Sequence, residues 1–101
     1  MKPGRYVLSP ASLEDLRGIG RYYRGEAGRQ VAANVVRGIR SACQLLADTP
    51  GEIGHARDEL RPGVRSMPTP PHVVFFRYAG GIIEVVRILH ERQDVAAEFD
   101  P

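Results

Sequence analysis

Two apolar segments separated by a pair of glycines constrain the fold of this 101-residue chain more than any other feature. "HVVFFRYA" (72–79) and "IIEVVRILH" (82–90) are rich in β-branched and aromatic residues, as strands are. "GG" between them suits a two-residue hairpin turn, because both turn positions require positive φ. The turn predicts a cross-strand ion pair between Arg77 and Glu84. The same register pairs Ala79 with Ile82, Tyr78 with Ile83, Phe76 with Val85 and Val74 with Arg87.

Upstream of this hairpin, two amphipathic segments predict a pair of helices. In "SPASLEDL", Ser9 is suited to cap free backbone N–H groups and Pro10 to occupy the first helical position. Apolar residues then recur at spacings of three and four until "GEAG" at 25–28. A second such stripe runs over about 29–47, and the short break predicts an antiparallel helical hairpin. The stripes are Leu13, Leu16, Ile19 and Tyr23, then Val31, Val35, Ile39, Ala42 and Leu46.

The remaining segments complete a small sheet. "YVLS" (6–9) and "VRSMP" (64–68) predict short strands, and "DVAAEF" (94–99) predicts one helical turn that docks Phe99. The order is β-α-α-β-β-β, which predicts one α+β domain over residues 1–101, with the helical hairpin on a small, mainly antiparallel sheet. Both long strands are apolar on both faces. The second face must therefore be covered by a curved sheet folding over its own residues, or by a partner.

The single cysteine and the isolated histidine of the long connection argue against a metal site. Cys43 lies among the apolar residues of the second helix, where we expect a small core residue. One cysteine excludes a disulfide within the chain and leaves no thiolate cluster for zinc. His55 lies in "PGEIGHARDELRPG" (50–63), where we expect a solvated side chain. We predict no metal and no cofactor.

The charge is distributed unevenly along the chain. The formal net charge is +2, and thirteen of the fourteen basic residues are arginines, Lys2 being the exception. Residues 16–47 carry six arginines and Glu26, a net of +5, whereas residues 79–101 carry two arginines and five acids, a net of −3. A basic middle and an acidic tail predict two different surfaces. No apolar run approaches the ~20 residues that cross a bilayer, and the N-terminus has no apolar signal core. We expect a cytoplasmic protein without membrane contact.

In four motifs the chain resembles the ParE branch of the RelE/ParE toxin superfamily. The resemblance covers "YVLSPASLEDLRGIGRYYRGEAG" and "PGVRSMPTPPHVVFFRYAGGIIEVVRILHERQD", which together span most of the chain in order. The matching positions are Leu8-Ser9-Pro10 with Asp15-Leu16, then Gly63-Val64-Arg65, then 72–77, then 86–94.

The resemblance implies the toxin of a type II toxin–antitoxin pair. Such a toxin is held inactive by an antitoxin, usually ParD-like, whose C-terminal segment wraps the toxin and whose N-terminal half binds DNA. Contact with DNA is then only indirect, through the antitoxin. Free toxins of the ParE branch typically act on DNA gyrase, whereas RelE-like relatives cut mRNA in the ribosome.

An RNase mechanism requires a general base, a general acid and cations that stabilise the charge on the phosphate. Arg65, Arg87 and Arg92 supply cations by residue type, and His90 supplies an acid or base. Against this reading, no Tyr follows Tyr78, and acids surround the tail and would repel a phosphate backbone. We therefore expect a binding module without catalytic residues, which binds gyrase and does not cleave RNA. A RelE-like RNase and a non-toxic sibling that only binds partners remain open alternatives.

Two sets of contact residues follow from this reading. The closing segment 90–99 is the candidate surface for the target, and the sheet face with the helical groove is the candidate surface for an acidic antitoxin tail. Structural roles remain open for several members, such as pairing of Arg87 with Glu91 or Asp94. The target candidates are His90, Arg92, Asp94 and Phe99; the antitoxin candidates are Leu16, Arg17, Tyr23, Arg65, Val74, Phe76 and Arg87.

Overall fold

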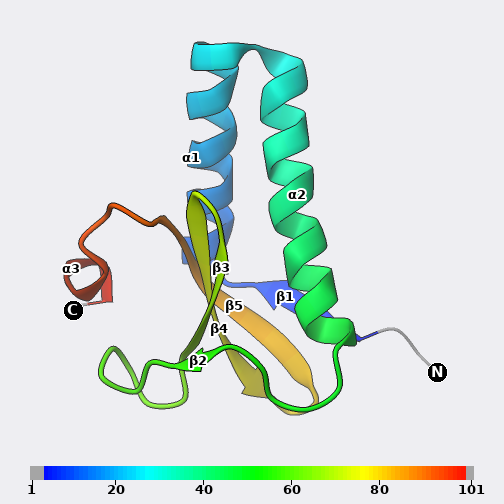
Figure 1. The fold of residues 1–101 in the computed structure, drawn as a ribbon, viewed down its shortest axis with the longest axis vertical. Coiled ribbons are helices and arrows are strands. Elements are labelled where there is room, and N and C mark those ends of the chain that lie inside the picture. The colour runs from blue at the N-terminus through cyan, green and yellow to red at the C-terminus, as the bar shows by residue number, and fades with distance from the viewer. Residues whose placement is uncertain (1–3, 100–101) are drawn as a thin grey trace.

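A computed structural model describes residues 4–99 and shows an α+β fold in which two long helices stand on a five-stranded mixed sheet (Figure 1). The strand order is β1-β5-β4-β3-β2, with β1 parallel to β5 and the other neighbours antiparallel. The fold class expected from the sequence is confirmed. The elements are β1 (Tyr6–Leu8), α1 (Pro10–Ala27), α2 (Arg29–Asp48), β2 (His55–Ala56), β3 (Arg65–Thr69), β4 (His72–Ala79), β5 (Ile82–His90) and α3 (Val95–Phe99).

The helical hairpin begins and turns where the sequence predicts. Ser9 caps α1, because its Oγ accepts a hydrogen bond from the backbone N–H of Ser12 at 3.0 Å. Gly28 has φ of 89°, a value that favours glycine, and it alone separates α1 from α2. The two helices run side by side from this turn down to the sheet (Figure 1).

The β4–β5 hairpin has the predicted register only near its turn. Arg77 pairs with Glu84 through an Nε–Oε1 contact of 2.5 Å, and Phe76 lies opposite Val85. A bulge follows, because Phe75 lies opposite Arg87 and leaves Val86 as an extra residue in β5. Val74 therefore lies opposite Ile88, and its predicted pairing with Arg87 is wrong. The short strand β2, which holds the exposed His55, was not predicted, since two residues in a Gly- and Pro-rich connection give no periodicity.

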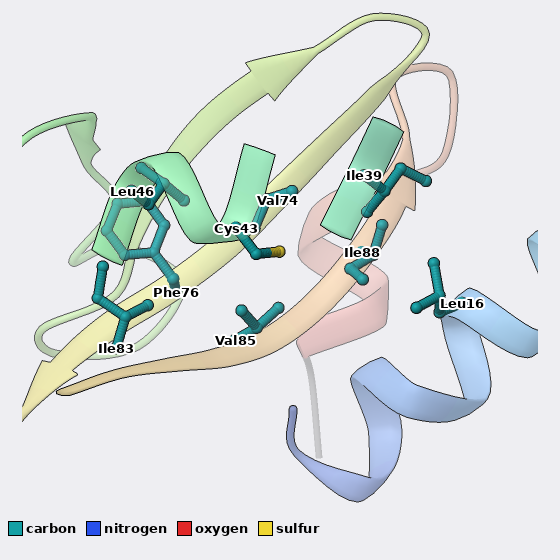
Figure 2. Close-up of a cluster of buried hydrophobic side chains, with 9 residues drawn as sticks. All are labelled: Leu16, Ile39, Cys43, Leu46, Val74, Phe76, Ile83, Val85 and Ile88. Atoms are coloured by element: carbon teal, nitrogen blue, oxygen red, sulfur yellow. The ribbon is translucent and has the colours of Figure 1, made fainter. Parts of the chain in front are cut away.

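The larger apolar cluster lies between the helices and the sheet (Figure 2). Cys43 is completely buried there, as expected, and burial raises the pKa of its thiol to about 11, so it stays protonated. Three residues expected to meet an antitoxin, Leu16, Val74 and Phe76, are buried in this cluster. For Val74 and Phe76, which are fully covered, that expectation is wrong, whereas Leu16 also lines the groove between α1 and α2. The cluster comprises Leu16, Ile39, Cys43, Leu46, Val74, Phe76, Ile83, Val85 and Ile88.

A smaller cluster lies on the other face of the sheet. The connection before β3 covers it together with α3, whose Phe99 ring meets the Phe75 ring edge-on at 5.2 Å. Phe99 is only 6% exposed, so the helical turn docks as predicted and leaves little of the ring for the expected contact with a target. The face that was expected to need a folded-over sheet or a partner is covered by other parts of the same chain. Its buried members are Val64, Phe75, Val86, Leu89 and Phe99.

Within residues 4–99, neither long helix is apolar enough over 18 residues to span a bilayer.

Candidate functional site

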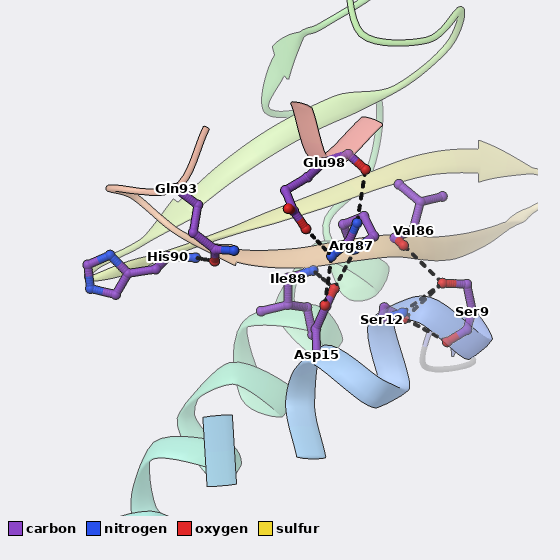
Figure 3. A network of polar contacts seen from close by, with 9 residues as sticks. All are labelled: Ser9, Ser12, Asp15, Val86, Arg87, Ile88, His90, Gln93 and Glu98. Carbon is purple, nitrogen blue, oxygen red and sulfur yellow. Dashed lines mark hydrogen bonds and ion pairs between the residues drawn. The ribbon is translucent and has the colours of Figure 1, made fainter. Parts of the chain in front are cut away.

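Arg87 is the centre of a polar network that ties β5 to α1 and α3 (Figure 3). Its guanidinium donates to both carboxylate oxygens of Asp15, at 2.8 and 2.9 Å, and to the Glu98 carboxylate at 2.8 Å and the Glu98 carbonyl at 3.0 Å. The Asp15 carboxylate also accepts from the backbone N–H of Ile88 at 2.9 Å. The hydrogen bonds to Asp15, and to a lesser extent the one to Glu98, raise the pKa of Arg87 above its ordinary value.

The network gives Arg87 a structural role. Its partners are Asp15 and Glu98, so the predicted alternatives, Glu91 and Asp94, are wrong. The arginine side chain keeps 20% of its surface and Asp15 keeps 14%, which makes this pair the most shielded of the ion pairs among the described residues. A guanidinium committed in this way is a poor cation for an RNA phosphate.

Arg65 is likewise engaged inside the chain. Its Nε and Nη2 donate to the carbonyls of Ile53 and Gly54 at 2.8 and 2.9 Å, and so hold the connection that precedes β2. Arg65 lies opposite Phe76, whereas His90 lies opposite His72. Four residues of strand separate those ladder positions, about 13 Å along β4. The four candidate RNase residues are therefore not brought to one point.

The end of β5 forms a tight polar turn. The backbone N–H of His90 donates to Gln93 Oε1 at 2.7 Å (Figure 3), and the N–H of Arg92 donates to His90 Nδ1 at 3.1 Å. Asp94 accepts from the N–H of Ala97 at 3.3 Å at the start of α3. The side chains of Arg92 and Asp94 are exposed. The turn therefore presents His90, Arg92 and Asp94 together at one end of the sheet, while Phe99 points into the smaller cluster.

A basic groove about 420 Å³ in volume separates α1 from α2. Arg17, Arg21 and Arg24 follow one another at helical spacing along α1, and Arg40 faces them from α2. Among residues 4–99, only Arg21 of these four makes an ion pair, with the exposed Glu14. The groove thus combines free guanidinium groups with an apolar floor to which Leu13 and Val36 contribute.

The sequence predicts this groove only in part. Arg17 is one of the predicted antitoxin contacts, and the +5 charge of residues 16–47 indicates the region. The missed signal is the i, i+4, i+7 spacing of Arg17, Arg21 and Arg24 in one helix. Tyr23, also selected for the antitoxin, lies outside the groove, since it lines a different hollow.

That second hollow, the aromatic groove, has a volume of about 430 Å³ and lies between α1 and the ends of β4 and β5. Its rings form a series in which Tyr22 and Tyr23 are 5.2 Å apart, Tyr23 and His72 6.2 Å, and His72 and His90 5.6 Å. Burial, followed by the neighbouring charge of His90, lowers the pKa of His72, while Glu91 acts in the opposite sense. Glu14 and Gln93 also line this groove.

The described residues 4–99 contain no group of three or more metal-ligating side chains.

Known proteins resemble this chain over nearly its whole length. Residues 6–95 match the family described as ParE toxin of type II toxin-antitoxin system, parDE. "Toxin ParE1" of Mycobacterium tuberculosis is 40% identical over 92 residues, which cover 90% of this chain and 93% of that protein. "Toxin ParE1" of Caulobacter vibrioides is 34% identical over 99 residues, covering 98% and 99%.

A solved structure supports the same fold. It is described as "Chromosomal ParDE TA system from P. aeruginosa" and superposes with a TM-score of 0.74 at 23% identity, covering 87% of this chain and 96% of that one. At this identity the likeness concerns the fold alone.

Proposed function

The chain belongs to the ParE family of toxins of type II toxin–antitoxin systems, and on this premise we propose that it inhibits DNA gyrase by direct binding and is neutralised by a ParD-like antitoxin. In this proposal residues 1–101 form one RelE/ParE-like domain that acts in the cytoplasm. It has no catalytic residue of its own and reaches DNA only through the antitoxin.

The observation that carries this proposal is that Arg65 and Arg87 are hydrogen-bonded within the chain. Both guanidinium groups donate to oxygens of the chain itself, at 2.8 to 3.0 Å. An RNase needs cations that are free to stabilise charge on a phosphate in the transition state. Among the candidate RNase cations, Arg92 then remains exposed, and a single cation is too few for that chemistry. A protein that acts by occupying a surface of its target has no such need.

The basic groove supports an acidic antitoxin segment as the neutralising partner. Arg17, Arg24 and Arg40 form no ion pair within residues 4–99, and carboxylates of a partner would complement them. Leu13 and Val36 offer an apolar floor to the same segment. An amphipathic helix with acidic flanks is the form of peptide that fits such a groove.

Gyrase supercoiling and mRNA cleavage on translating ribosomes, measured with the same purified protein, test the target. We expect loss of supercoiling that antitoxin restores, with message left intact. His90→Ala should weaken inhibition by no more than about tenfold, or ~1.4 kcal/mol, because the side chain is one of several contacts and performs no chemistry. Complete loss with His90→Ala, accompanied by cut message in the wild type, would favour the RelE-like reading. Inactivity in both assays would favour the non-toxic sibling.

Charge reversal tests the antitoxin site. The double variant Arg17→Glu/Arg24→Glu should weaken binding of a ParD-like antitoxin about 100-fold, since two attractive pairs become repulsive. Arg29→Glu is the matched control, because Arg29 is exposed at the start of α2 and does not line the groove. Equal affinities for the double variant and the control would place the antitoxin elsewhere.

A further inference from the structure

The two grooves lie on opposite flanks of α1. Arg17, Arg21 and Arg24 line the basic groove, whereas Glu14 and Tyr22 line the aromatic groove. At 3.6 residues per turn, the complete sets of α1 residues that line the two grooves centre on opposite sides of the helix axis, and Glu14 lies at the boundary, beside Arg21. A partner seated in one groove therefore leaves the other flank of the helix accessible.

The aromatic groove is a prearranged surface with one ring open to solvent. Tyr22 is 61% exposed, and its ring meets the Tyr23 ring edge-on at an interplanar angle of 89°. Deeper in the ring series, His72 is 4% exposed and lies against both Tyr23 and His90. Hydrogen bonds through Gln93 and the Arg92 N–H hold the backbone and ring of His90. Binding here would order little beyond the Tyr22 side chain, which keeps the entropic cost low.

Whereas the basic groove is lined by arginines, the aromatic groove is lined by acidic side chains. Glu14 and Asp15 line it, and among residues 4–99 no arginine or lysine does. Asp15 is already bonded to Arg87 and to the Ile88 N–H, so Glu14 is the carboxylate with capacity to spare. Its existing pair with Arg21 leaves both side chains 63% exposed, and such surface pairs are exchanged at little cost.

A cation satisfies both features of the groove together. The face of a tyrosine ring attracts an ammonium or guanidinium group, and a nearby carboxylate completes its charge. We propose that the aromatic groove receives an arginine or lysine side chain from a surface loop of the protein target, seated on Tyr22 and paired with Glu14. The assignment rests on the proposed function, and it gives the target-contacting surface its chemistry: this toxin binds acids on one flank of α1 and a base on the other.

Short peptides test the groove without the target. The full chain, labelled with ¹⁵N, is titrated with acetyl-Gly-Arg-Gly-amide, and the Glu and Leu tripeptides serve as comparison probes. We expect the arginine probe to shift the amides of Tyr22, His90 and Gln93, with a dissociation constant of about 10 mM or below. Tyr22→Ala and Glu14→Gln should each weaken it about three- to fivefold. Leu45→Ala, which removes an apolar side chain of α2 that is 67% exposed and outside the groove, should leave it unchanged.

Three outcomes overturn the assignment: no shifts with the arginine probe, equal shifts with the leucine probe, or equal weakening by Leu45→Ala. In parallel, gyrase binding and antitoxin binding are measured for wild type, Tyr22→Ala and Leu45→Ala. The assignment expects Tyr22→Ala alone to lose at least about tenfold in gyrase affinity, with antitoxin affinity retained. If the wild-type protein does not bind gyrase but binds the arginine probe at Tyr22, the proposed target is wrong and the groove assignment is retained. If gyrase binds wild type and Tyr22→Ala equally, the groove assignment is wrong and the target stands.

Discussion

The two faces of the sheet bury equally apolar residues under very different covers. Phe75 and Phe76 are neighbours in β4, both fully buried, yet they belong to different clusters on opposite faces. Two helices of 18 and 20 residues cover Phe76, whereas Phe75 lies under the connection before β3 and the five-residue α3. The first cover is regular and long; the second is short and irregular.

Besides apolar packing, cation–π contacts and an ion pair hold the short cover in place. Arg57 lies over the Phe75 ring at 5.6 Å and Arg61 over the Phe99 ring at 5.3 Å, and Arg87 holds α3 through Glu98. Cation–π contacts at partly exposed sites contribute only about 0.5–1 kcal/mol each. We therefore expect the smaller cluster to open locally before the larger one unfolds. Because this face is covered, the candidate surfaces for partners are the two grooves beside α1 and the polar turn after β5.

Truncating the two neighbouring phenylalanines breaks the comparison most directly. Phe76→Ala should lower the free energy of unfolding by about 4 kcal/mol, since the two long helices over this face limit collapse into the cavity. Phe75→Ala should cost about 3 kcal/mol, because the short cover can relax into the space. Urea unfolding followed by circular dichroism measures both. Equal losses, or a larger loss for Phe75→Ala, would contradict the claim that the helical cover is the more rigid of the two.

Removing the Arg87 side chain should have the next largest effect. Arg87→Ala leaves Asp15 in a position only 14% exposed, with the Ile88 N–H as its remaining partner. We expect a loss of about 3 kcal/mol, the low end for a broken buried pair because both side chains retain some solvent contact. A double-mutant cycle with Asp15→Ala should give a coupling of at least about 1 kcal/mol. A coupling near zero would mean that the network contributes nothing to holding β5 against α1.

Removing the Phe99 ring sharpens the comparison at the smaller cluster alone. Phe99→Ala should cost about 2 kcal/mol, less than a central phenylalanine because α3 lies at the edge of the fold. Hydrogen exchange should quicken in residues 57–64 and 95–99 and stay unchanged in α1 and α2. Uniformly faster exchange throughout the sheet and helices would contradict separate local stability of this face.

The smallest effect concerns pH. Burial lowers the pKa of His72 below its ordinary 6.5, so the unfolded chain takes up this proton at a higher pH than the folded one. The neutral ring therefore stabilises the fold above pH 6.5, and this contribution is lost as pH falls from 6.5 through the folded value. His72→Gln should flatten that part of the stability curve, measured by urea unfolding at a series of pH values. His55→Gln, at an exposed position, is the control; identical slopes for the two variants would contradict the assignment to His72.

Periodic patterns gave most of the fold, because local rules decide them. Ser9 caps the start of α1 and Gly28 its end. The Gly80-Gly81 turn sets the register of the β4–β5 hairpin as far as Phe76. The bulge at Val86 has no such local mark, since no glycine, proline or other turn residue interrupts the strand segment 82–90. That one extra residue places Ile88 rather than Arg87 on the helix-covered face, and so it hid the role of Arg87.

Long-range contacts account for the site residues that the sequence misassigned. Arg87 meets Asp15 across 72 positions, a pairing that neither residue's neighbours signal. Val74 and Phe76 were assigned to a partner because the strands looked uncovered, and the helices turned out to cover them. The cover of the other face comes from the connection before β3 and from α3, segments with too little periodicity to predict where they pack. Charge did better, because the +5 segment did mark the basic groove.

Titration of gyrase with the purified toxin tests the central claim, that this protein acts by occupying a surface, without catalysis. Supercoiling activity is followed as the molar ratio of toxin to gyrase rises, and reporter mRNA on translating ribosomes is assayed at the same ratios. The account predicts that inhibition saturates near stoichiometric ratios and that the message stays whole. Cleavage of message by toxin present at about one-hundredth of the ribosome concentration would require turnover, and it would contradict the account.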